Sequence, residues 1–263
     1  MLRRIYLMKT KFGKIVALGI LTSAVLMSNI ATAGIIKVTE GDFEAGAGQI
    51  TFSEFALGTV NPFYVPGDYA GNAGDPDVNF AGWFDGQMLS LNSGVDCPGA
   101  AASACIVGTP TGPLSLDANS TDTFIANDGS NPTSPVLSGS PVFNGGIAVL
   151  FSTDQFGVGF DGGFFNAVGS TAITAFARDG SLIGSVSNTV LGVEFLGLVT
   201  DDQTASIAGV FLDLVGAEPA GFAIDNIRFG GVDDVRVEDV PEPSSLMLLV
   251  SALFGLRFLR KNK

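Results

Sequence analysis

The sequence predicts an all-β fold, an antiparallel β-sandwich of jelly-roll type, with a short apolar helix near each end of the chain. Short runs of β-branched and aromatic residues recur between clusters of Gly, Asn, Asp and Pro, which is typical of strands separated by turns. The chain holds 35 Gly and 21 Phe in 263 residues, and Leu-rich helical periodicity is hard to find. Consecutive strands without helical crossovers favour two packed antiparallel sheets.

The N-terminal segment, residues 1–33, has the three parts of a secretory signal peptide. Residues 1–14 are basic, residues 15–30 are almost wholly apolar, and Ala31-Thr32-Ala33 supplies the small residues of a signal-peptidase site. We therefore expect a signal helix that signal peptidase removes between Ala33 and Gly34. The alternative is an uncleaved anchor, for which a run of about sixteen residues is short against a ~30 Å bilayer core.

A strongly acidic domain, residues 34–239, follows the signal segment. All 26 acidic residues but only four of the 13 basic residues lie between Gly34 and Pro243, so this stretch has a formal charge of −22. Such a charge repels phosphate backbones and anionic lipid, which excludes nucleic acid as a partner. The chain contains no His, which excludes a Ser-His-Asp triad, a Cys-His dyad, zincin motifs and His-ligated metals. A domain of this length can bury a full core without metals.

The predicted strands follow one another along this domain. The clearest pair is Thr171–Arg178 and Ser181–Ser187, because Asp179-Gly180 between them predicts a type I′ hairpin, whose two central residues need positive φ. The other strands are expected near Gln49–Phe55, Val78–Phe84, Ile147–Thr153, Phe156–Phe160, Val193–Val199, Ser206–Val215 and Phe222–Phe229.

Residues 96–146 are expected to form a long excursion with little regular structure and one strand near Thr123–Ala126. Six prolines lie in it among many Ser, Thr and Gly residues. Such a loop either carries a binding site or is a neutral insertion, and the sequence leaves both interpretations open. Cys97 and Cys105 enclose a short loop, and in an oxidising exported compartment we expect them to form a disulfide that stabilises the fold by roughly 2–3 kcal/mol.

The C-terminal segment, residues 240–263, begins with Val-Pro-Glu-Pro, continues with an apolar run from Leu246 to Leu256 and ends in a basic tail. This order resembles the PEP-CTERM sorting signal of bacterial envelope proteins. The resemblance implies that a membrane protease-transpeptidase, exosortase, recognises Pro241, Glu242 and Pro243 and removes the tail, in bacteria that make exopolysaccharide. The two prolines keep the tripeptide extended, within reach of such an enzyme.

Before processing, the same segment is expected to form a short transmembrane helix. At ~1.5 Å per residue the run Leu246–Leu256 spans only ~16 Å and Ser244–Leu259 spans ~24 Å, which is workable if Arg257 snorkels. Cations after an apolar run stay in the cytoplasm, so the acidic domain lies outside the membrane. The alternative is a proline-rich linker before a tail anchor. An ice-binding role, sometimes assigned to this kind of segment, gains no support, because the domain has no repeated Thr-x-Thr ladder.

Two acidic residues are candidate ligands of a structural Ca²⁺. Strict alternation along Gly221–Phe229 places Asp225 on an otherwise apolar face, so its carboxylate must be paired, bind a cation or be turned away by a bulge. The stretch resembles the last strand of many carbohydrate-binding jelly rolls, and Gly41-Asp42-Phe43-Glu44 resembles their opening strand. The resemblance implies Asp225 and Glu44 as calcium ligands. The run that starts at Asp75 fails as an EF-hand loop, because Phe80 stands where Gly is required.

Four further residues are candidates for carbohydrate chemistry. Glu194 is the candidate acid of a glycoside hydrolase, since strand neighbours could desolvate it and raise its pKa. No second Glu stands at a recognisable spacing, and the alternative is a solvent-facing Glu194. Trp83, the only Trp, is a candidate for stacking on a sugar ring or for the core, and Tyr64 and Tyr69 are comparable stacking candidates.

These features predict an exported, exosortase-sorted envelope or extracellular-matrix protein of non-enzymatic, structural or adhesive type, associated with exopolysaccharide. Its expected partners are signal peptidase, exosortase, polysaccharide and, before processing, the membrane. The alternatives are a Ca²⁺-assisted carbohydrate-binding module and a secreted glycoside hydrolase.

Overall fold

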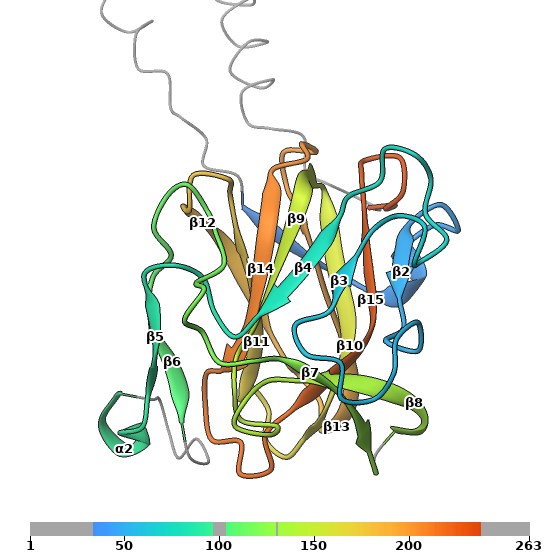
Figure 1. Ribbon diagram of the computed structural model, residues 1–263. Coiled ribbons are helices and arrows are strands. Elements are labelled where there is room, and N and C mark those ends of the chain that lie inside the picture. The colour runs from blue at the N-terminus through green and yellow to red at the C-terminus, as the bar shows by residue number, and fades with distance from the viewer. Residues whose placement is uncertain (1–33, 97–103, 130, 238–263) are drawn as a thin grey trace, which may run out of the picture. The chain divides into compact units, whose positions relative to one another are not determined.

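The chain forms two antiparallel β-sheets that pack face to face, as the sequence predicts (Figure 1). The computed structural model describes residues 34–96, 104–129 and 131–237. The seven-stranded sheet has the order β1 (Ile35–Val38), β13 (Gly192–Thr200), β10 (Gly157–Phe165), β15 (Ala223–Gly230), β8 (Asn131–Ser138) and β7 (Phe124–Asp128), and β2 (Gly48–Ile50) also pairs with β15. The six-stranded sheet has the order β12 (Leu182–Ser187), β11 (Thr171–Phe176), β14 (Ile207–Leu214), β9 (Ile147–Gln155), β4 (Val78–Ala81) and β3 (Phe63–Tyr64).

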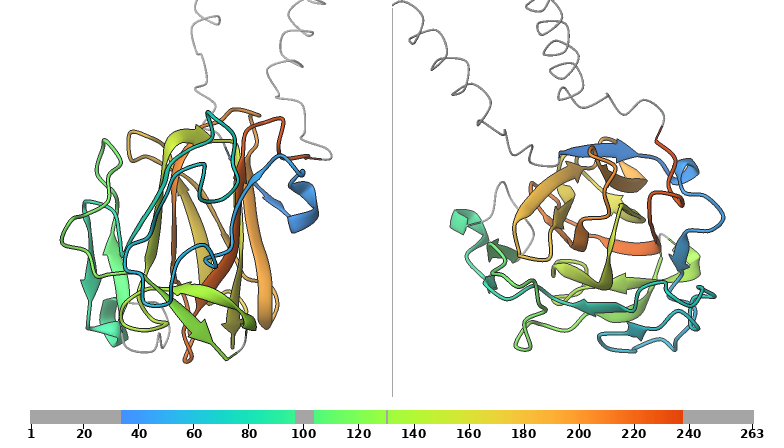
Figure 2. Two further views of the ribbon diagram at one scale, coloured as in Figure 1. Left: turned by 45° about the vertical axis from the view of Figure 1, so that its right-hand side comes forward. Right: turned by 90° about the horizontal axis from the view of Figure 1, so that it is seen from above.

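A separate hairpin of β5 (Gln87–Ser90) and β6 (Cys105–Gly108) lies outside the six-stranded sheet (Figure 2). Ile106 of β6 packs with Ala208 and Phe211 of β14 in an apolar cluster of its own. Every residue of β14 is buried. The sandwich core covers one face of this strand, and the hairpin covers part of the other. The helices of the described residues are short, a 3-10 turn η1 (Glu40–Asp42) and α2 (Ser93–Asp96).

The main core lies between the two sheets and is rich in aromatic side chains. Phe52, Tyr64 and Phe80 meet edge to face, with ring centroids 5.7, 5.9 and 6.3 Å apart. Phe151 of β9 contacts Phe229 of β15 at a centroid distance of 5.3 Å, and so joins one sheet to the other. Burying each such ring stabilises the fold by about 2–3 kcal/mol, so this core is the main source of stability.

Most of the predicted strands are confirmed to within a few residues, with two differences. The strand predicted at Gln49–Phe55 ends at Ile50, because Phe52 adopts a φ of +57°, a left-handed conformation that interrupts a strand. In residues 96–146 the one strand predicted near Thr123–Ala126 is confirmed as β7, but β6 and β8 also lie in this segment, which is expected to hold little other regular structure. Pro135 lies in β8 opposite Asn127 of β7, and β8 pairs with β15 at a single position, Leu137 with Ile224.

The hairpin of β11 and β12 is confirmed, but its turn differs from the prediction. Gly180 has a φ of +84°, whereas Asp179 is not among the residues with positive φ, so the turn is not of type I′. The N–H of Gly180 donates to the carbonyl of Ala177, and the N–H of Ala177 donates to the carbonyl of Ser181. This is a three-residue loop that ends on a left-handed glycine, and Asp179 closes it by accepting from the N–H and hydroxyl of Ser181.

The first and last described residues lie at the same end of the sandwich (Figure 1). Ile35 pairs with Thr200 at the end of β13, and Val235 packs with Val199 and forms a bridge with Phe43. We call this the terminal end. Strand β13 runs nine residues from there to Gly192, which is about 27 Å at ~3.4 Å per residue. We call the opposite end, formed by the loops 164–170, 188–192 and 215–221, the distal end.

Asp213 is a carboxylate buried between β14 and the β5–β6 hairpin. Its Oδ2 accepts from the N–H of Ile106 at 3.2 Å, and its Oδ1 has no hydrogen-bond partner among the described residues. Burial raises the pKa of the Asp213 carboxyl to about 7, against smaller opposing effects of the N–H groups of Leu214 and Ile106. The folded protein therefore favours the neutral acid at a position where the unfolded chain would be ionised.

This carboxyl makes the stability of the fold depend on pH. An acid whose pKa is raised by folding keeps its proton in the folded state after the unfolded chain has lost it, so the free energy of unfolding falls as the pH rises from about 4 to about 7. Asp213→Asn is expected to reduce this slope and to raise stability above about pH 7 by up to a few kcal/mol, at ~1.4 kcal/mol per pKa unit. Urea unfolding measured at several pH values tests this prediction.

The matched control is Asp233→Asn, which removes the same charge from an exposed turn. This variant is expected to keep the slope of the wild-type protein. Equal slopes in Asp213→Asn and the wild-type protein would contradict the prediction.

Candidate functional site

The distal end carries a group of exposed apolar side chains, which we call the distal apolar surface. Its members are at least half exposed and lie at the distal ends of β10 and β13 and in the loops next to them: Phe164, Val168, Val190, Leu191 and Val193. The loops contact each other, because the position a Cβ would take on Gly192 is 3.6 Å from the ring of Phe164. Scattered apolar residues are normal on a surface, whereas a contiguous group of this kind is typical of an interaction site.

Asn188 joins the two loops through hydrogen bonds of its side-chain amide. Its side chain is almost fully buried, and its Oδ1 accepts from the N–H groups of Ser170 and Thr171 at 2.9 and 3.1 Å. Its Nδ2 donates to the carbonyls of Ala167 and Val190 at 2.7 and 3.2 Å. One amide therefore satisfies four backbone groups from both loops, which fixes their relative positions.

Glu218, from a third segment, supports the first of these loops, residues 164–170. The residue is fully buried, and its Oε2 accepts from the N–H of Asn166 at 2.7 Å, the hydroxyl of Ser170 at 2.8 Å and the N–H of Ala167 at 3.3 Å. Hydrogen bonds to a charged acceptor are stronger than those between neutral groups. Buried polar groups therefore fix the loops that carry the distal apolar surface.

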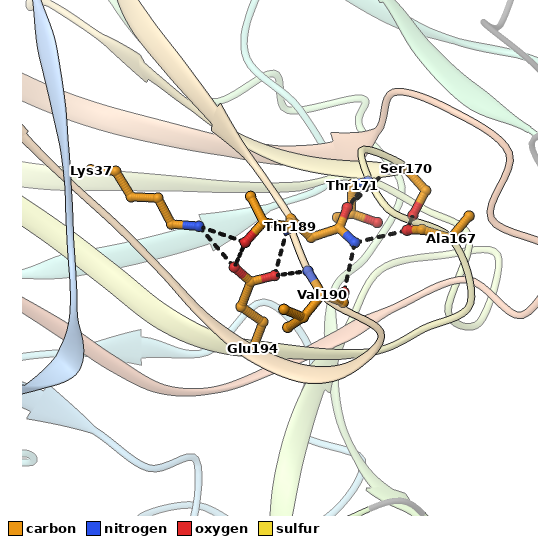
Figure 3. Close-up of polar contacts among 8 residues, drawn as sticks. Lys37, Ala167, Ser170, Thr171, Thr189, Val190 and Glu194 are labelled. Atoms are coloured by element: carbon orange, nitrogen blue, oxygen red, sulfur yellow. Dashed lines mark hydrogen bonds and ion pairs between the residues drawn. The ribbon is translucent and has the colours of Figure 1, made fainter.

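Glu194 is part of this support, not a proton donor. Its carboxylate accepts from Nζ of Lys37 at 2.8 Å, from the N–H and hydroxyl of Thr189 at 2.6 and 2.7 Å and from the N–H of Val190 at 3.0 Å (Figure 3). Burial raises the pKa of Glu194, but these four contacts outweigh it, so the pKa is lowered. A hydrolase acid needs a raised pKa, so the geometry does not favour Glu194 in that role. Nor does the side chain face open solvent, since only 10% of it is exposed.

A β-bulge in β15 changes the position predicted for Asp225. Asn226 adopts a φ of +49°, and the pairing of β10 with β15 shifts register between Gly159 and Asp161. The bulge changes the phase of the alternation, so Ile224 belongs to the core together with Ile227. Asp225 lies on the opposite face of the sheet from Ile224, opposite Asp161 in the ladder. Of the three alternatives that the sequence leaves for Asp225, the structure shows the bulge, which moves its carboxylate to the other face of the sheet, where it accepts from the N–H of Asn226.

A groove runs along this outer face at the distal end, and we call it the distal groove. Its first part has a volume of about 180 Å³, and a smaller hollow of about 20 Å³ shares Asp128 and Gly163 with it. The first part is lined by Asp128, Phe143, Gly163, Phe164, Ala220, Gly221 and Phe222, and the hollow adds Val136, Asp161, Gly162, Val193, Ala223, Ile224 and Asp225. Asp128 and Phe164 thus line the first part together, and Asp161 and Asp225 line only the smaller hollow.

Asp161 is the acid of the groove whose electrostatics are clearest. Its Oδ2 accepts from Nδ2 of Asn226 at 2.9 Å. Burial raises the pKa of Asp161, the hydrogen bond from Asn226 opposes this effect, and repulsion by Glu40 adds to it while Arg228 counteracts it. The net direction is upward, so the negative charge of Asp161 is not fully compensated by its surroundings.

The predicted aromatic ligand-binding residues are not accessible. Trp83 is 7% exposed and packs with Phe84 and Phe211 beside the β5–β6 hairpin, while its Nε1 donates to Asp117 at 3.2 Å. Of the two alternatives for Trp83, the structure therefore shows the core. Tyr64 and Tyr69 are also buried, and the hydroxyl of Tyr69 donates to the carbonyl of Pro76. The exposed aromatic side chains of the described residues are Phe63 and Phe164.

Glu44 and Asp225 do not form a shared calcium site. The carboxylate of Glu44 pairs with Arg236, and its N–H donates to the carbonyl of Asp234. Asp225 accepts from the N–H of Asn226 and pairs with Asp161 in the ladder. In the part of the chain that the structure describes, no group of three or more Asp, Glu or Cys residues has an arrangement that could hold a metal ion.

Several predicted residues lie outside the described ranges. These are Ala33, Cys97, Pro241, Glu242 and Pro243, together with both apolar helices. Gly34, the residue after the predicted signal cleavage, is described, and its N–H donates to Oδ1 of Asp201 at 2.7 Å. Cys105 is buried and is not a free thiol, and its pairing with Cys97 stays a prediction. Within residues 34–96, 104–129 and 131–237, no helix has the length and hydropathy needed to cross a bilayer.

Phe164, Asp128 and Asp161 are candidates that the sequence pattern does not identify. The nearest signal is Asp161-Gly-Gly-Phe-Phe165, in which two glycines interrupt a strand beside an aromatic pair. Glycines inside a strand often mark a bulge or a close approach of a ligand. The pairing of β10 with β13 does shift register between Gly162 and Phe165.

The comparisons with known proteins concern the end of the chain. No curated protein matches the sequence. The PEP-CTERM protein-sorting motif matches residues 239–261, which confirms the resemblance seen in Pro241, Glu242 and Pro243. The chain therefore carries a PEP-CTERM sorting motif, which supports an exported protein that exosortase sorts at the membrane to the cell envelope.

Proposed function

We propose that the protein is a non-enzymatic adhesive component of the cell envelope that binds exopolysaccharide through its distal end. The observation that carries this proposal is the position of the distal apolar surface. It lies at the end of the sandwich opposite the last described residue, Val237, and the sorting motif begins two residues later. A domain attached through its terminal end would present the distal end to the surrounding matrix.

The rigidity of the distal loops supports an adhesive role. Asn188 satisfies backbone groups of both loops, Glu218 holds the loop 164–170, and Glu194 bonds the second loop and Lys37 of β1. A surface that is ordered before binding loses little conformational entropy when a ligand arrives. The same contacts place Glu194 in support of the fold, which favours the adhesive function over the hydrolase alternative.

The sorting step is tested by the recognition tripeptide. Replacing Pro241, Glu242 and Pro243 together by Ala is expected to prevent removal of the C-terminal tail, because the extended conformation and the carboxylate are both lost. A C-terminal epitope tag on the full-length chain then stays attached in the envelope fraction, whereas the tag on the unaltered chain is lost. Equal loss of the tag from both proteins would contradict exosortase recognition of this tripeptide.

The adhesive role is tested at Leu191, which is 61% exposed in the distal apolar surface. Leu191→Ser is expected to lower binding of the full-length chain to exopolysaccharide purified from the producing cells by about five-fold, which corresponds to ~1 kcal/mol. Its melting temperature should not change, because the side chain contributes little to the core. The matched control is Leu182→Ser on β12, which is 59% exposed and lies outside this surface. Equal binding by the two variants would argue against the proposed function.

The exported location is tested by the two cysteines. The full-length chain recovered from the envelope is expected to react with a maleimide only after reduction, because an oxidising compartment favours a Cys97–Cys105 disulfide. Cys97→Ser should lower the free energy of unfolding by roughly 2–3 kcal/mol. Rapid labelling of the unreduced, unfolded wild-type chain would show that the thiols are free and would contradict this prediction.

A further inference from the structure

Gly34, the residue after the predicted signal-peptidase cut, is bound by an acidic residue that lies 167 positions later in the sequence. Its N–H donates to Oδ1 of Asp201 at 2.7 Å, and its carbonyl accepts from the N–H of Asp201 at 3.0 Å. Ile35 pairs with Thr200 next to this contact, where the ladder of β1 with β13 begins. Asp201 therefore holds the nitrogen that the cut would turn into the amino terminus of the mature chain.

The carboxylate of Asp201 lies directly against the backbone of Gly34. A Cβ on Gly34 would be 2.6 Å from Oδ2 and 3.2 Å from Cγ of Asp201, both closer than an ordinary van der Waals contact. A larger residue at position 34 would have to displace the carboxylate. Glycine at this position thus allows the close contact between the two residues.

Asp201 forms no ion pair with a basic side chain among the described residues. All four Lys and Arg residues of this part of the chain are paired with other acids. The stretch from Gly34 to Pro243 has a formal charge of −22, so its field also favours a positive charge beside Asp201. As long as Gly34 is joined to Ala33, it offers Asp201 only a neutral amide.

We propose that Asp201 is the binding site for the amino terminus that signal peptidase creates, and that their ion pair stabilises the pairing of β1 with β13. Hydrolysis of the Ala33–Gly34 bond adds the hydroxyl of water to the carbonyl carbon of Ala33 and its hydrogen to the nitrogen of Gly34. The new acid then loses a proton and the new amine gains one, so Gly34 carries an ammonium group with three donors. A hydrogen bond between two charged groups is stronger than one from an amide. This inference rests on the predicted cleavage and goes beyond the proposed function.

Strand β1, which this ion pair would hold, contacts both sheets. It is an edge strand of the seven-stranded sheet, and Ile35 lies against β12 of the other sheet, since a Cβ on Gly184 would be 2.4 Å from its Cγ1. Lys37 of the same strand donates to Glu194, which also accepts from the loop 188–192 (Figure 3). Removal of the signal segment would thereby stabilise a strand that joins the two sheets and supports a distal loop.

The proposal is tested on two chains that differ by one residue, 34–263 and 33–263, in a non-ionic detergent. Residues 33–263 form a compact unit by themselves, and both sheets lie within residues 35–230. Each chain has one terminal ammonium group, but in the chain 33–263 it lies on Ala33 and Gly34 again offers an amide. We expect the chain 33–263 to melt about 2–4 °C lower. Its β1 amides should exchange hydrogen about five-fold faster.

Three variants locate the effect. Asp201→Asn still accepts from Gly34 but has no charge, so the difference between the two chains is expected to disappear. Asp233→Asn is the matched control, because it removes an equal charge from an exposed turn, and the difference should remain. Gly34→Ala in the chain 34–263 keeps the ammonium group but displaces the carboxylate, so it should lower the melting temperature to about that of the chain 33–263.

The outcomes separate the cleavage from the ion pair. N-terminal sequencing of the protein recovered from the envelope is expected to begin at Gly34, and another first residue would overturn the proposal at the cleavage step. Equal melting and equal exchange of the two chains would overturn the ion pair. A difference that persists in Asp201→Asn would also overturn it, because the ammonium group would then act elsewhere. The proposed adhesive function is tested separately, by Leu191→Ser and Leu182→Ser.

Discussion

Asn226 has a backbone φ of +49°, and this one left-handed residue lets Ile224, Ile227 and Phe229 of β15 all reach the core. Without the bulge, strict alternation would place either the carboxylate of Asp225 between the two sheets or Ile224 outside the core. With the bulge, Asp225 is buried on the outer face of its sheet, where it accepts from the N–H of Asn226. Asn tolerates this conformation better than most residues, at a cost of about 1 kcal/mol. Because β15 pairs with β10, β2 and β8, the same residue sets the packing of the core and the position of the carboxylates in the distal groove.

The four basic residues of the described domain affect its surface charge more than its stability. Three of the four ion pairs join the segment 37–44 to β13, β15 and Arg236. Exposed ion pairs stabilise a fold by only about 0–1 kcal/mol each, so stability comes from the aromatic core. The pairing leaves the remaining surface negative, and copies of the domain repel one another. A protein can then expose apolar side chains at its distal end without strong self-association, since this repulsion opposes it.

The sequence predicts the architecture well because alternation, glycine turns and aromatic runs are local signals. The dipeptide Asp179-Gly180 predicts the hairpin of β11 and β12. The type of turn depends on the φ of Asp179, which the dipeptide alone does not determine. The site could be predicted only in part. The sequence correctly identifies Asp225 as a carboxylate in an apolar strand. Its position opposite Asp161 depends on the bulge and on the strand register, which no local sequence pattern encodes. The burial of Trp83 depends on the β5–β6 hairpin, which lies in a segment whose prolines indicate a loop.

The distal groove and the terminal end are joined by a single strand. Strand β15 begins at Ala223, which lines the groove, and ends at Gly230, shortly before the bridge between Phe43 and Val235. A load applied between a ligand at the distal end and the chain beyond Val237 would act along this strand. The hydrogen bonds of an antiparallel ladder are perpendicular to the strands, so such a load shears the pairs of β15 with β10 together and does not open them one at a time. A central strand that runs from the distal end to the terminal end therefore suits a domain that holds a polymer against tension.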